Sequence, residues 1–175
     1  AMAEELASIQ ALGVYELVPL PPGASALPAK WVFRIKRNTD GTVDRYKARM
    51  VVKGFKQRPG IDFQELFAPA SRYSTLRAFL AHVAAADLEL AQLDVKVAFL
   101  NGTLDEVIYM QQPPGFEHGT NVCLLKRALY GLRHATRAWH GRLAAELRAF
   151  GFAPTSADPC LFVRTQDGET SFLLV

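Results

Sequence analysis

Alternation of apolar and polar residues predicts a β-hairpin in the first third of the chain. Over residues 30–37, apolar side chains fall on one side of a strand and basic side chains on the other. The turn-forming residues 38–41 follow, and a second strand is expected over 43–53. We therefore predict a half-buried hairpin with a basic open face. The apolar positions of the first strand are Trp31, Phe33 and Ile35, and the basic ones are Arg34 and Lys36.

Two later segments have helical periodicity. Apolar residues recur at helical spacing over 75–86, and Ser74 stands where an N-cap is expected. A second helix should begin near Thr136 and end at Gly151. One side of this helix carries an apolar stripe, which we interpret as core packing: Trp139, Leu143, Leu147 and Phe150.

Shorter apolar runs predict further strands. They cover residues 88–94, 122–125, 161–164 and 170–175, the last two joined by a turn at 166–168. Residues 1–29 are rich in proline and glycine after a short amphipathic start, and we interpret them as an extended lead-in. The order of elements over 30–175 predicts an α+β fold with an antiparallel sheet and packed helices.

Composition limits the class of protein without identifying it. The chain has 175 residues, 50% of them hydrophobic, and lacks the run of about 20 apolar residues that spans a bilayer. The N-terminal residues do not resemble a signal peptide, and the two cysteines and four histidines have no zinc-ligand spacing. We expect an intracellular protein with no membrane partner and no zinc site.

Charge is unevenly distributed along the chain. Between residues 30 and 77, twelve Lys and Arg residues accompany four acids, which gives this segment a net charge of +8 in a chain of +3. A second basic stretch covers residues 126–148. Both stretches are consistent with solvated faces or with a bound polyanion, and charge by itself does not separate these alternatives.

One carboxylate stands out because its neighbours are apolar. Asp94 lies within residues 92–102, and an ionised side chain in such a run must be paired, hydrated or bound to a cation. It could also cap a turn at a strand end. The acid thus has a structural and a metal-binding interpretation.

Three segments together resemble the reverse transcriptase of copia-type LTR retrotransposons. The first is Lys-Trp-Val-Phe-Arg-Ile-Lys at 30–36, with Arg-Tyr-Lys-Ala-Arg-Met-Val-Val-Lys-Gly-Phe at 45–55. The second is Gln-Leu-Asp-Val-Lys-Val-Ala-Phe-Leu-Asn-Gly at 92–102, followed by the segment 107–116. The third is Leu-Tyr-Gly-Leu-Arg-His-Ala-Thr-Arg-Ala-Trp at 129–139. The resemblance extends over about residues 14–175.

The resemblance implies a right-hand polymerase, of which residues 30–175 would form the fingers and part of the palm. Asp94 would be the first metal-binding aspartate, with the carbonyl of Val95 near the same ion. Phe99 matches the aromatic residue that excludes a ribonucleotide 2′-hydroxyl. Nucleotide contact is further implied for Lys47, Arg49, Tyr130 and Gly131.

The same resemblance implies the chemistry and the partners. The parent protein would be an RNA-directed DNA polymerase that uses two Mg²⁺ ions, an RNA template, a DNA primer and dNTPs. Its other parts would be the rest of the Pol polyprotein, namely the remaining palm, the thumb and RNase H. A cytoplasmic location in a virus-like particle, with possible nuclear entry of the product complex, would follow.

Two departures from the family pattern qualify this expectation. His134 and Thr136 stand where the family usually has Gln and Pro. The sequence also ends at Val175, where an aromatic-x-Asp-Asp turn would be expected to begin, so we expect this chain alone not to polymerise. A non-catalytic nucleic-acid-binding or relic domain remains the alternative, and a metal-dependent nuclease is less well supported.

Overall fold

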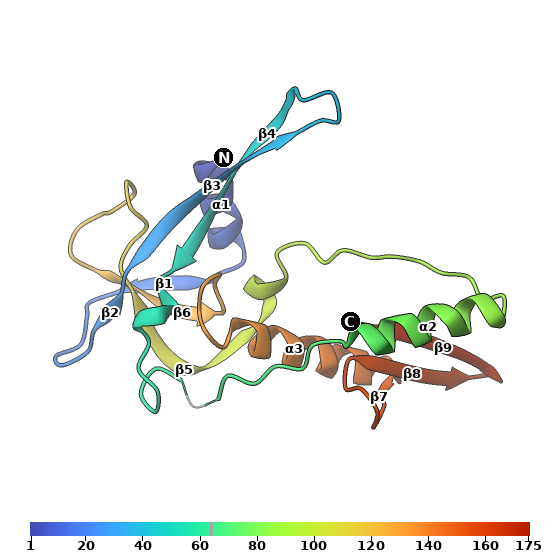
Figure 1. Cartoon of the computed structure of the whole chain (residues 1–175). Helices are drawn as coiled ribbons and strands as arrows, with labels where there is room; N and C mark the ends of the chain where they lie inside the picture. The colour runs from blue at the N-terminus through green and yellow to red at the C-terminus, as the bar shows by residue number, and fades with distance from the viewer. Residues whose placement is uncertain (64) are drawn as a thin grey trace. The chain divides into compact units, whose positions relative to one another are not determined.

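The computed structural model describes residues 1–63 and 65–175 (Figure 1). The chain divides into two compact units, each described here by itself. Unit 1 comprises residues 1–66 and 97–139, and unit 2 comprises residues 67–96 and 140–175. None of the described helices has both the length and the apolarity needed to cross a bilayer.

Unit 1 combines a helix, a four-stranded sheet and a long hairpin. Its sheet has the order β1-β6-β5-β2, antiparallel except for the short β2–β5 pair, while β3 and β4 form the separate hairpin. The elements are α1 (Met2–Ala11), β1 (Tyr15–Val18), β2 (Ala26–Leu27), β3 (Ala29–Arg37), β4 (Val43–Val52), the 3₁₀ helices η1 (Gly54–Lys56) and η2 (Ala98–Asn101), β5 (Thr103–Met110) and β6 (Val122–Arg127).

Unit 2 contains α2 (Tyr73–Ala85) and a three-stranded antiparallel sheet, β7-β8-β9. The strands are β7 (Ala153–Pro154), β8 (Leu161–Gln166) and β9 (Glu169–Leu174). Helix α3 (Ala135–Ala149) begins in unit 1 and continues into unit 2. The predicted α+β class and the largely antiparallel pairing are confirmed.

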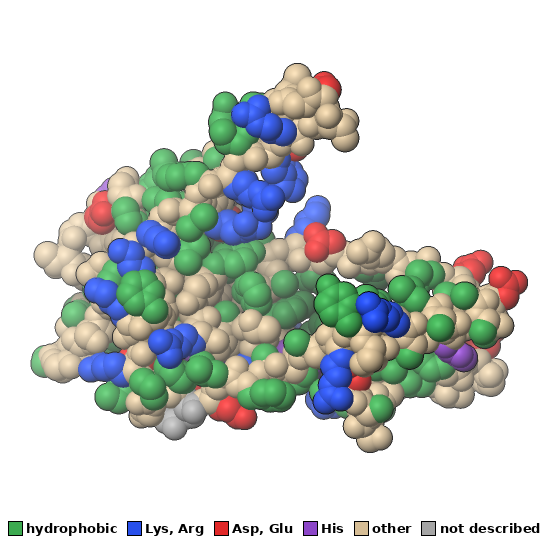
Figure 2. Space-filling model, viewed as in Figure 1, with side chains coloured by type: hydrophobic (Ala, Val, Ile, Leu, Met, Phe, Trp, Pro, Cys, Tyr) green, Lys and Arg blue, Asp and Glu red, His purple; other side chains and the backbone are tan. Residues whose placement is uncertain are grey.

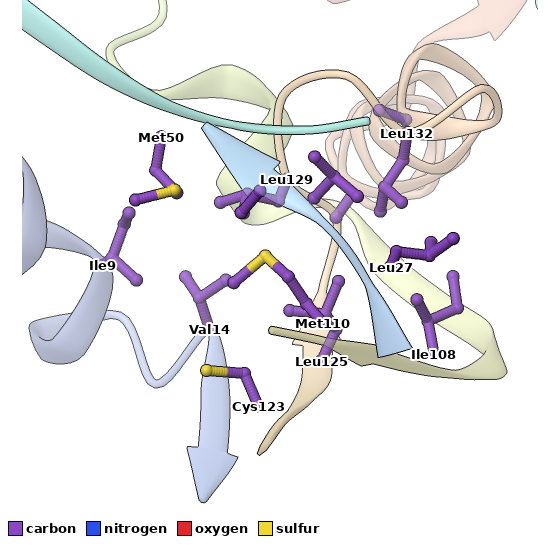
Figure 3. Packing of buried hydrophobic residues seen from close by; sticks show 14 of the residues in the cluster. Ile9, Val14, Leu27, Met50, Ile108, Met110, Cys123, Leu125, Leu129 and Leu132 are labelled. Carbon is purple, nitrogen blue, oxygen red and sulfur yellow. The ribbon is translucent and has the colours of Figure 1, made fainter. Parts of the chain in front are cut away.

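The core of unit 1 forms where one side of β4 meets α1 and the sheet (Figure 3). Period-two alternation buries Ala48, Met50 and Val52 of β4. Residues 1–29 also contribute to this core, because Ile9 and Val14 are only 1% and 0% exposed. The other buried side chains labelled in Figure 3 are Leu27, Ile108, Met110, Cys123, Leu125, Leu129 and Leu132.

The predicted hairpin is confirmed, but its predicted half-burial is wrong for its far half. The strands pair from Ala29 with Val52 to Arg37 with Val43. Trp31 is partly buried at the base, whereas Phe33 and Ile35 are exposed. Figure 1 shows the reason: the far part of the hairpin extends past α1, so no described element of unit 1 covers it.

The strand predicted over residues 88–94 is wrong. The segment is extended without strand pairing, and Leu90 and Leu93 are exposed. An alternating run forms a strand only when a neighbour accepts its backbone hydrogen bonds, and no described strand pairs with this one. By contrast, β5 follows it in the sequence and was not predicted.

Both predicted helices are present, with two corrections. Helix α3 ends at Ala149, and Gly151 is its C′ residue as expected: its φ is +83°, and hydrogen bonds from the Gly151 N–H to the Arg148 carbonyl and from the Phe152 N–H to the Leu147 carbonyl form a Schellman motif. Phe150 lies beyond the last helical residue and is exposed, so its predicted place in the core stripe is wrong. Leu147 is buried as expected.

The N-cap predicted at Ser74 is also wrong. Helix α2 begins at Tyr73, and the carboxylate of Asp158 caps it from a distant part of the chain. Its Oδ2 accepts hydrogen bonds from the backbone N–H of Arg72 at 3.3 Å and from the hydroxyl of Thr75 at 2.5 Å, while Oδ1 accepts one from the N–H of Cys160 at 2.9 Å. Asp158 therefore ties α2 to the segment that enters β8.

We expect Asp158→Ala to lower the free energy of unfolding by about 1–2 kcal/mol, the usual loss for an acidic cap. The hydrogen bond from Thr75, followed by that from Cys160, lowers the pKa of Asp158 below its ordinary value. The carboxylate therefore contributes stability above about pH 4 and loses it as the pH falls further. Urea unfolding of both proteins at neutral and acidic pH measures this, and a difference that stays constant with pH would contradict it.

Candidate nucleotide-contact site

Three side chains that are distant in the sequence meet in unit 1. Arg49 comes from β4, Phe99 from η2, and Tyr130 from the loop after β6. The guanidinium carbon of Arg49 lies 5.6 Å from the centre of the Tyr130 ring. The ring centres of Phe99 and Tyr130 are 5.4 Å apart with an interplanar angle of 85°, an edge-to-face contact. All three side chains are partly buried, and Phe99 and Tyr130 pack on the core.

Arg49 keeps its charge available. It forms no salt bridge with a carboxylate among the described residues, and its buried Nε has no hydrogen-bond partner there. The tyrosine ring instead holds the guanidinium through a cation–π contact. A planar guanidinium held in this way can donate to phosphate oxygens.

Arg49 belongs to a wider cationic surface, the basic face of the hairpin. Because directly paired residues share one side of a two-stranded sheet, the register places Arg34 beside Lys47 and Lys36 beside Arg45. Figure 2 shows Lys and Arg side chains gathered along the hairpin. The six cations of the basic face are Lys30, Arg34, Lys36, Arg45, Lys47 and Arg49.

The crowding of these cations affects Lys47. Desolvation, followed by the nearby charges of Arg49, Lys36 and Arg45, lowers the pKa of Lys47 below its ordinary value. Glu5 of α1 acts in the opposite direction, and its carboxylate accepts a 3.4 Å hydrogen bond from the Met50 N–H. The basic face is therefore a region of positive potential, and a bound anion would reduce the repulsion between its cations.

The close packing of two backbone segments of the protein requires a glycine at position 131. Its φ is +91°, and a Cβ there would collide with the carbonyl oxygen of Val52. A Cβ on Gly54 would in turn collide with the carbonyl oxygen of Gly131. The two segments are joined by a 2.8 Å hydrogen bond from the Val52 N–H to the Tyr130 carbonyl. The close approach at Gly131 thus fixes Tyr130 against the end of β4.

Asp94 and Val95 lie in unit 2, on the unpaired segment after α2, and both are exposed. The described residues contain no group of three or more His, Cys, Asp or Glu side chains able to hold a metal ion. Asp94 by itself supplies only one carboxylate. The residues present therefore do not make up a two-metal site.

The unusual residue His134 is buried, with 3% exposure, behind the Tyr130 loop. Its Nδ1 lies 3.5 Å from Nε2 of Gln57, and its Nε2 lies 3.6 Å from a carboxylate oxygen of Glu106. Gln57 is also buried, and its Oε1 accepts a 2.8 Å hydrogen bond from the Arg133 N–H. Sequence reasoning missed Gln57 and Glu106, since no local pattern indicates that they meet His134.

Thr136, the second unusual residue, lies in the first turn of α3. The helix forms there without the proline that the family usually has.

Comparison with known proteins identifies the family of the chain. A family model described as reverse transcriptase (RNA-dependent DNA polymerase) matches residues 12–175. The chain belongs to the reverse transcriptase family. A retrovirus-related Pol polyprotein from transposon TNT 1-94 of Nicotiana tabacum is 44% identical over the whole chain, and one from transposon RE1 of Arabidopsis thaliana is 40% identical.

These relatives are much longer proteins than this chain. The chain covers 13% of the TNT 1-94 polyprotein and 12% of the RE1 polyprotein. The resemblance to copia-type elements is confirmed by these relatives. No solved structure matches the chain.

We expect Gly131→Ala to destabilise the chain by about 3 kcal/mol or more, because strain at positive φ adds to a backbone collision. Gly119→Ala is the matched control: its φ is +65°, but a Cβ there meets nothing within 4 Å, so only about 1 kcal/mol of strain is expected. Urea unfolding compares the two variants. Equal losses of stability in the two variants would show that the close approach of the two backbones at Gly131 does not require a glycine there.

We expect His134 to make unit 1 sensitive to acid. Desolvation lowers the pKa of His134 below 6.5 and outweighs the opposing effect of Glu106, while Arg137 lowers it further and Asp105 raises it. The unfolded chain then binds the proton more readily, so stability is complete above about pH 6.5 and falls as the pH decreases.

His134→Gln keeps a hydrogen-bonding side chain and removes this titration. Between pH 7.5 and 5, the wild-type protein should lose stability relative to the variant, by at most about 1.4 kcal/mol per pH unit. Urea midpoints across this range measure the difference. A wild-type protein that gains relative stability in acid would show that the contact with Glu106 dominates instead.

Proposed function

We propose that this chain supplies the fingers and part of the palm of an RNA-directed DNA polymerase within a longer Pol polyprotein. The observation that carries the proposal is the convergence of Arg49, Phe99 and Tyr130 in unit 1. These residues come from the three separate segments of the resemblance, and packing at 5–6 Å unites them.

The three residues suit contact with an incoming deoxynucleoside triphosphate. Arg49, with Lys47 beside it on the basic face, supplies fixed positive charge for phosphate oxygens. Tyr130 supports the guanidinium and is itself held by the junction at Gly131. Phe99 packs against the edge of Tyr130, where its bulk would exclude a 2′-hydroxyl. In this proposal, Gly131 acts through Tyr130 and does not itself touch the nucleotide.

The metal part of the proposal concerns the complete polymerase. Mg²⁺ ions there would activate the primer 3′-hydroxyl and screen the triphosphate. Asp94 and the Val95 carbonyl are the ligands that this chain would contribute. Because the described residues do not complete that site, we expect no primer extension by this chain alone.

The proposed partners follow from the same surfaces. RNA template and DNA primer are polyanions, and the basic face of the hairpin suits their phosphates. The remaining palm, thumb and RNase H of the polyprotein would complete the enzyme, in the cytoplasm within a particle.

A non-catalytic nucleic-acid-binding role is the alternative. The basic face would support such binding without any contribution from Phe99 or Tyr130. Saturable binding of a free nucleotide therefore distinguishes the two proposals.

The test is binding of a fluorescent deoxynucleoside triphosphate to this chain. Arg49→Gln should weaken binding about 10-fold or more, because it removes a charged hydrogen-bond donor. Arg77→Gln is the matched control, since Arg77 is an exposed arginine on α2 in unit 2, and it should leave the affinity unchanged.

Phe99→Ala should reduce the ratio of the affinity for deoxyribonucleotides to the affinity for ribonucleotides in the same assay. Equal nucleotide affinity in the Arg49 variant and the wild type would contradict the proposed site. Oligonucleotide binding without nucleotide binding would favour the non-catalytic alternative.

A further inference from the structure

The side chain of Gln57 holds the loop that carries Tyr130. Gln57 directly follows η1 and is only 3% exposed. Its Oε1 accepts a 2.8 Å hydrogen bond from the backbone N–H of Arg133, and its Nε2 donates to the Asp62 carbonyl at 3.3 Å. These two bonds fix the orientation of the amide, because a backbone N–H needs an acceptor and a carbonyl needs a donor.

The orientation of this amide determines the state of His134. The Gln57 Nε2 lies 3.5 Å from the His134 Nδ1, and an amide nitrogen is only a donor. Nδ1 therefore has to accept, so the imidazole is neutral and carries its proton on Nε2. That nitrogen is buried without a hydrogen-bond partner among the described residues, and it lies 3.6 Å from the Glu106 carboxylate. The neutral ring and the amide thus hold each other in one arrangement.

Protonation of the ring is incompatible with this arrangement. A charged imidazole has an N–H at both nitrogens, so its Nδ1–H would face the NH₂ group of Gln57, donor against donor. Turning the amide over gives the ring an acceptor, but it also turns the NH₂ group toward the Arg133 N–H and the oxygen toward the Asp62 carbonyl. Both existing hydrogen bonds of the amide are then lost. The backbone at Arg133, two positions after Gly131, is released.

Burial decides the protonation state of His134 against the charges around it. Burial has the largest effect and lowers the pKa of His134, Glu106 opposes it, Arg137 lowers the pKa further and Asp105 raises it. Glu106 and Asp105 belong to β5, and Arg137 belongs to α3. The ring is therefore neutral at neutral pH and takes up a proton in acid. The neighbouring charged groups are the Arg137–Glu65 and Arg58–Asp62 salt bridges, each at 3.3 Å, and the guanidinium of Arg133 over the Phe63 ring.

We propose that His134 is a positioning residue for nucleotide binding. In its neutral form it keeps the Gln57 amide in the orientation that holds the Tyr130 loop, and its protonation releases the loop and weakens the contact with the nucleotide. This inference rests on the proposed function, because the ring of Tyr130 supports the guanidinium of Arg49 there.

The test follows the binding of a fluorescent deoxynucleoside triphosphate to the whole chain at pH 7.5 and pH 5. The terminal phosphate also takes up a proton in this range, so each variant is compared with the wild type at the same pH. The wild-type chain should lose at least about fivefold more affinity in acid than His134→Gln, the effect of one hydrogen bond. Far-UV circular dichroism at each pH shows that the proteins compared are folded.

His82→Gln is the matched control, because His82 is an exposed histidine on α2 in unit 2. This variant should lose as much affinity in acid as the wild type. Equal losses in the wild type and His134→Gln would overturn the proposal.

Gln57→Glu tests the role of the amide directly. A carboxylate accepts on both oxygens, so it can hold the Arg133 N–H and the protonated ring at the same time. This variant should therefore lose less affinity in acid than the wild type. A loss as large as that of the wild type would contradict the proposed role of the amide orientation.

A second measurement does not depend on nucleotide. The exchange of the Arg133 amide hydrogen is followed by NMR without ligand and corrected for the intrinsic rate at each pH. Its protection should fall in acid in the wild type but not in His134→Gln, and constant protection in the wild type overturns the proposal. If Arg49→Gln binds nucleotide as tightly as the wild type, the proposed function fails and the link to the nucleotide with it, whereas the exchange at Arg133 still decides whether His134 holds the loop.

Discussion

Unit 1 depends on the close contact between the end of β4 and the loop that carries Tyr130. The hydrogen bond from Val52 to the Tyr130 carbonyl requires the two backbones to approach so closely that side chains at Gly54 and Gly131 would collide with them. This contact joins segments almost 80 positions apart. It fixes the hairpin that carries Arg49 relative to the ring that supports the guanidinium, and the cluster of Arg49, Phe99 and Tyr130 depends on it.

The base and the far half of the hairpin have different surroundings. At its base, one side packs into the core through Met50 and Val52, and this packing anchors the strands. Further out, no described element of unit 1 covers the same side, so Phe33 and Tyr46 remain exposed, and the cations lie on the opposite side. The base of the hairpin is therefore part of the core of unit 1, whereas its far half is not.

Unit 2 is organised by a buried acid. Asp158 binds the start of α2 and the N–H of Cys160 together. The smaller core of this unit lies elsewhere, between α3 and β8, where Ala144 and Leu147 meet Phe162. Asp94 belongs to the same unit but lies on an exposed segment that no described strand stabilises, so its surroundings provide none of the pairing that a metal ligand normally has.

The sequence by itself determined the family, the α+β class, the hairpin, both long helices and the final β-turn. These features depend on the local periodicity of apolar residues, on turn residues or on ordered motifs. All of these are properties of residues that lie close together in the sequence. The resemblance also identified Arg49, Phe99 and Tyr130, but not their contact.

Only the tertiary structure decided which apolar runs are covered, which acid caps α2, and where residues 88–94 find no partner. It also brought His134 to Gln57 and Glu106. The physical reason is the same in each case: burial and hydrogen-bond satisfaction depend on groups that are remote in the sequence, and a local pattern does not specify them.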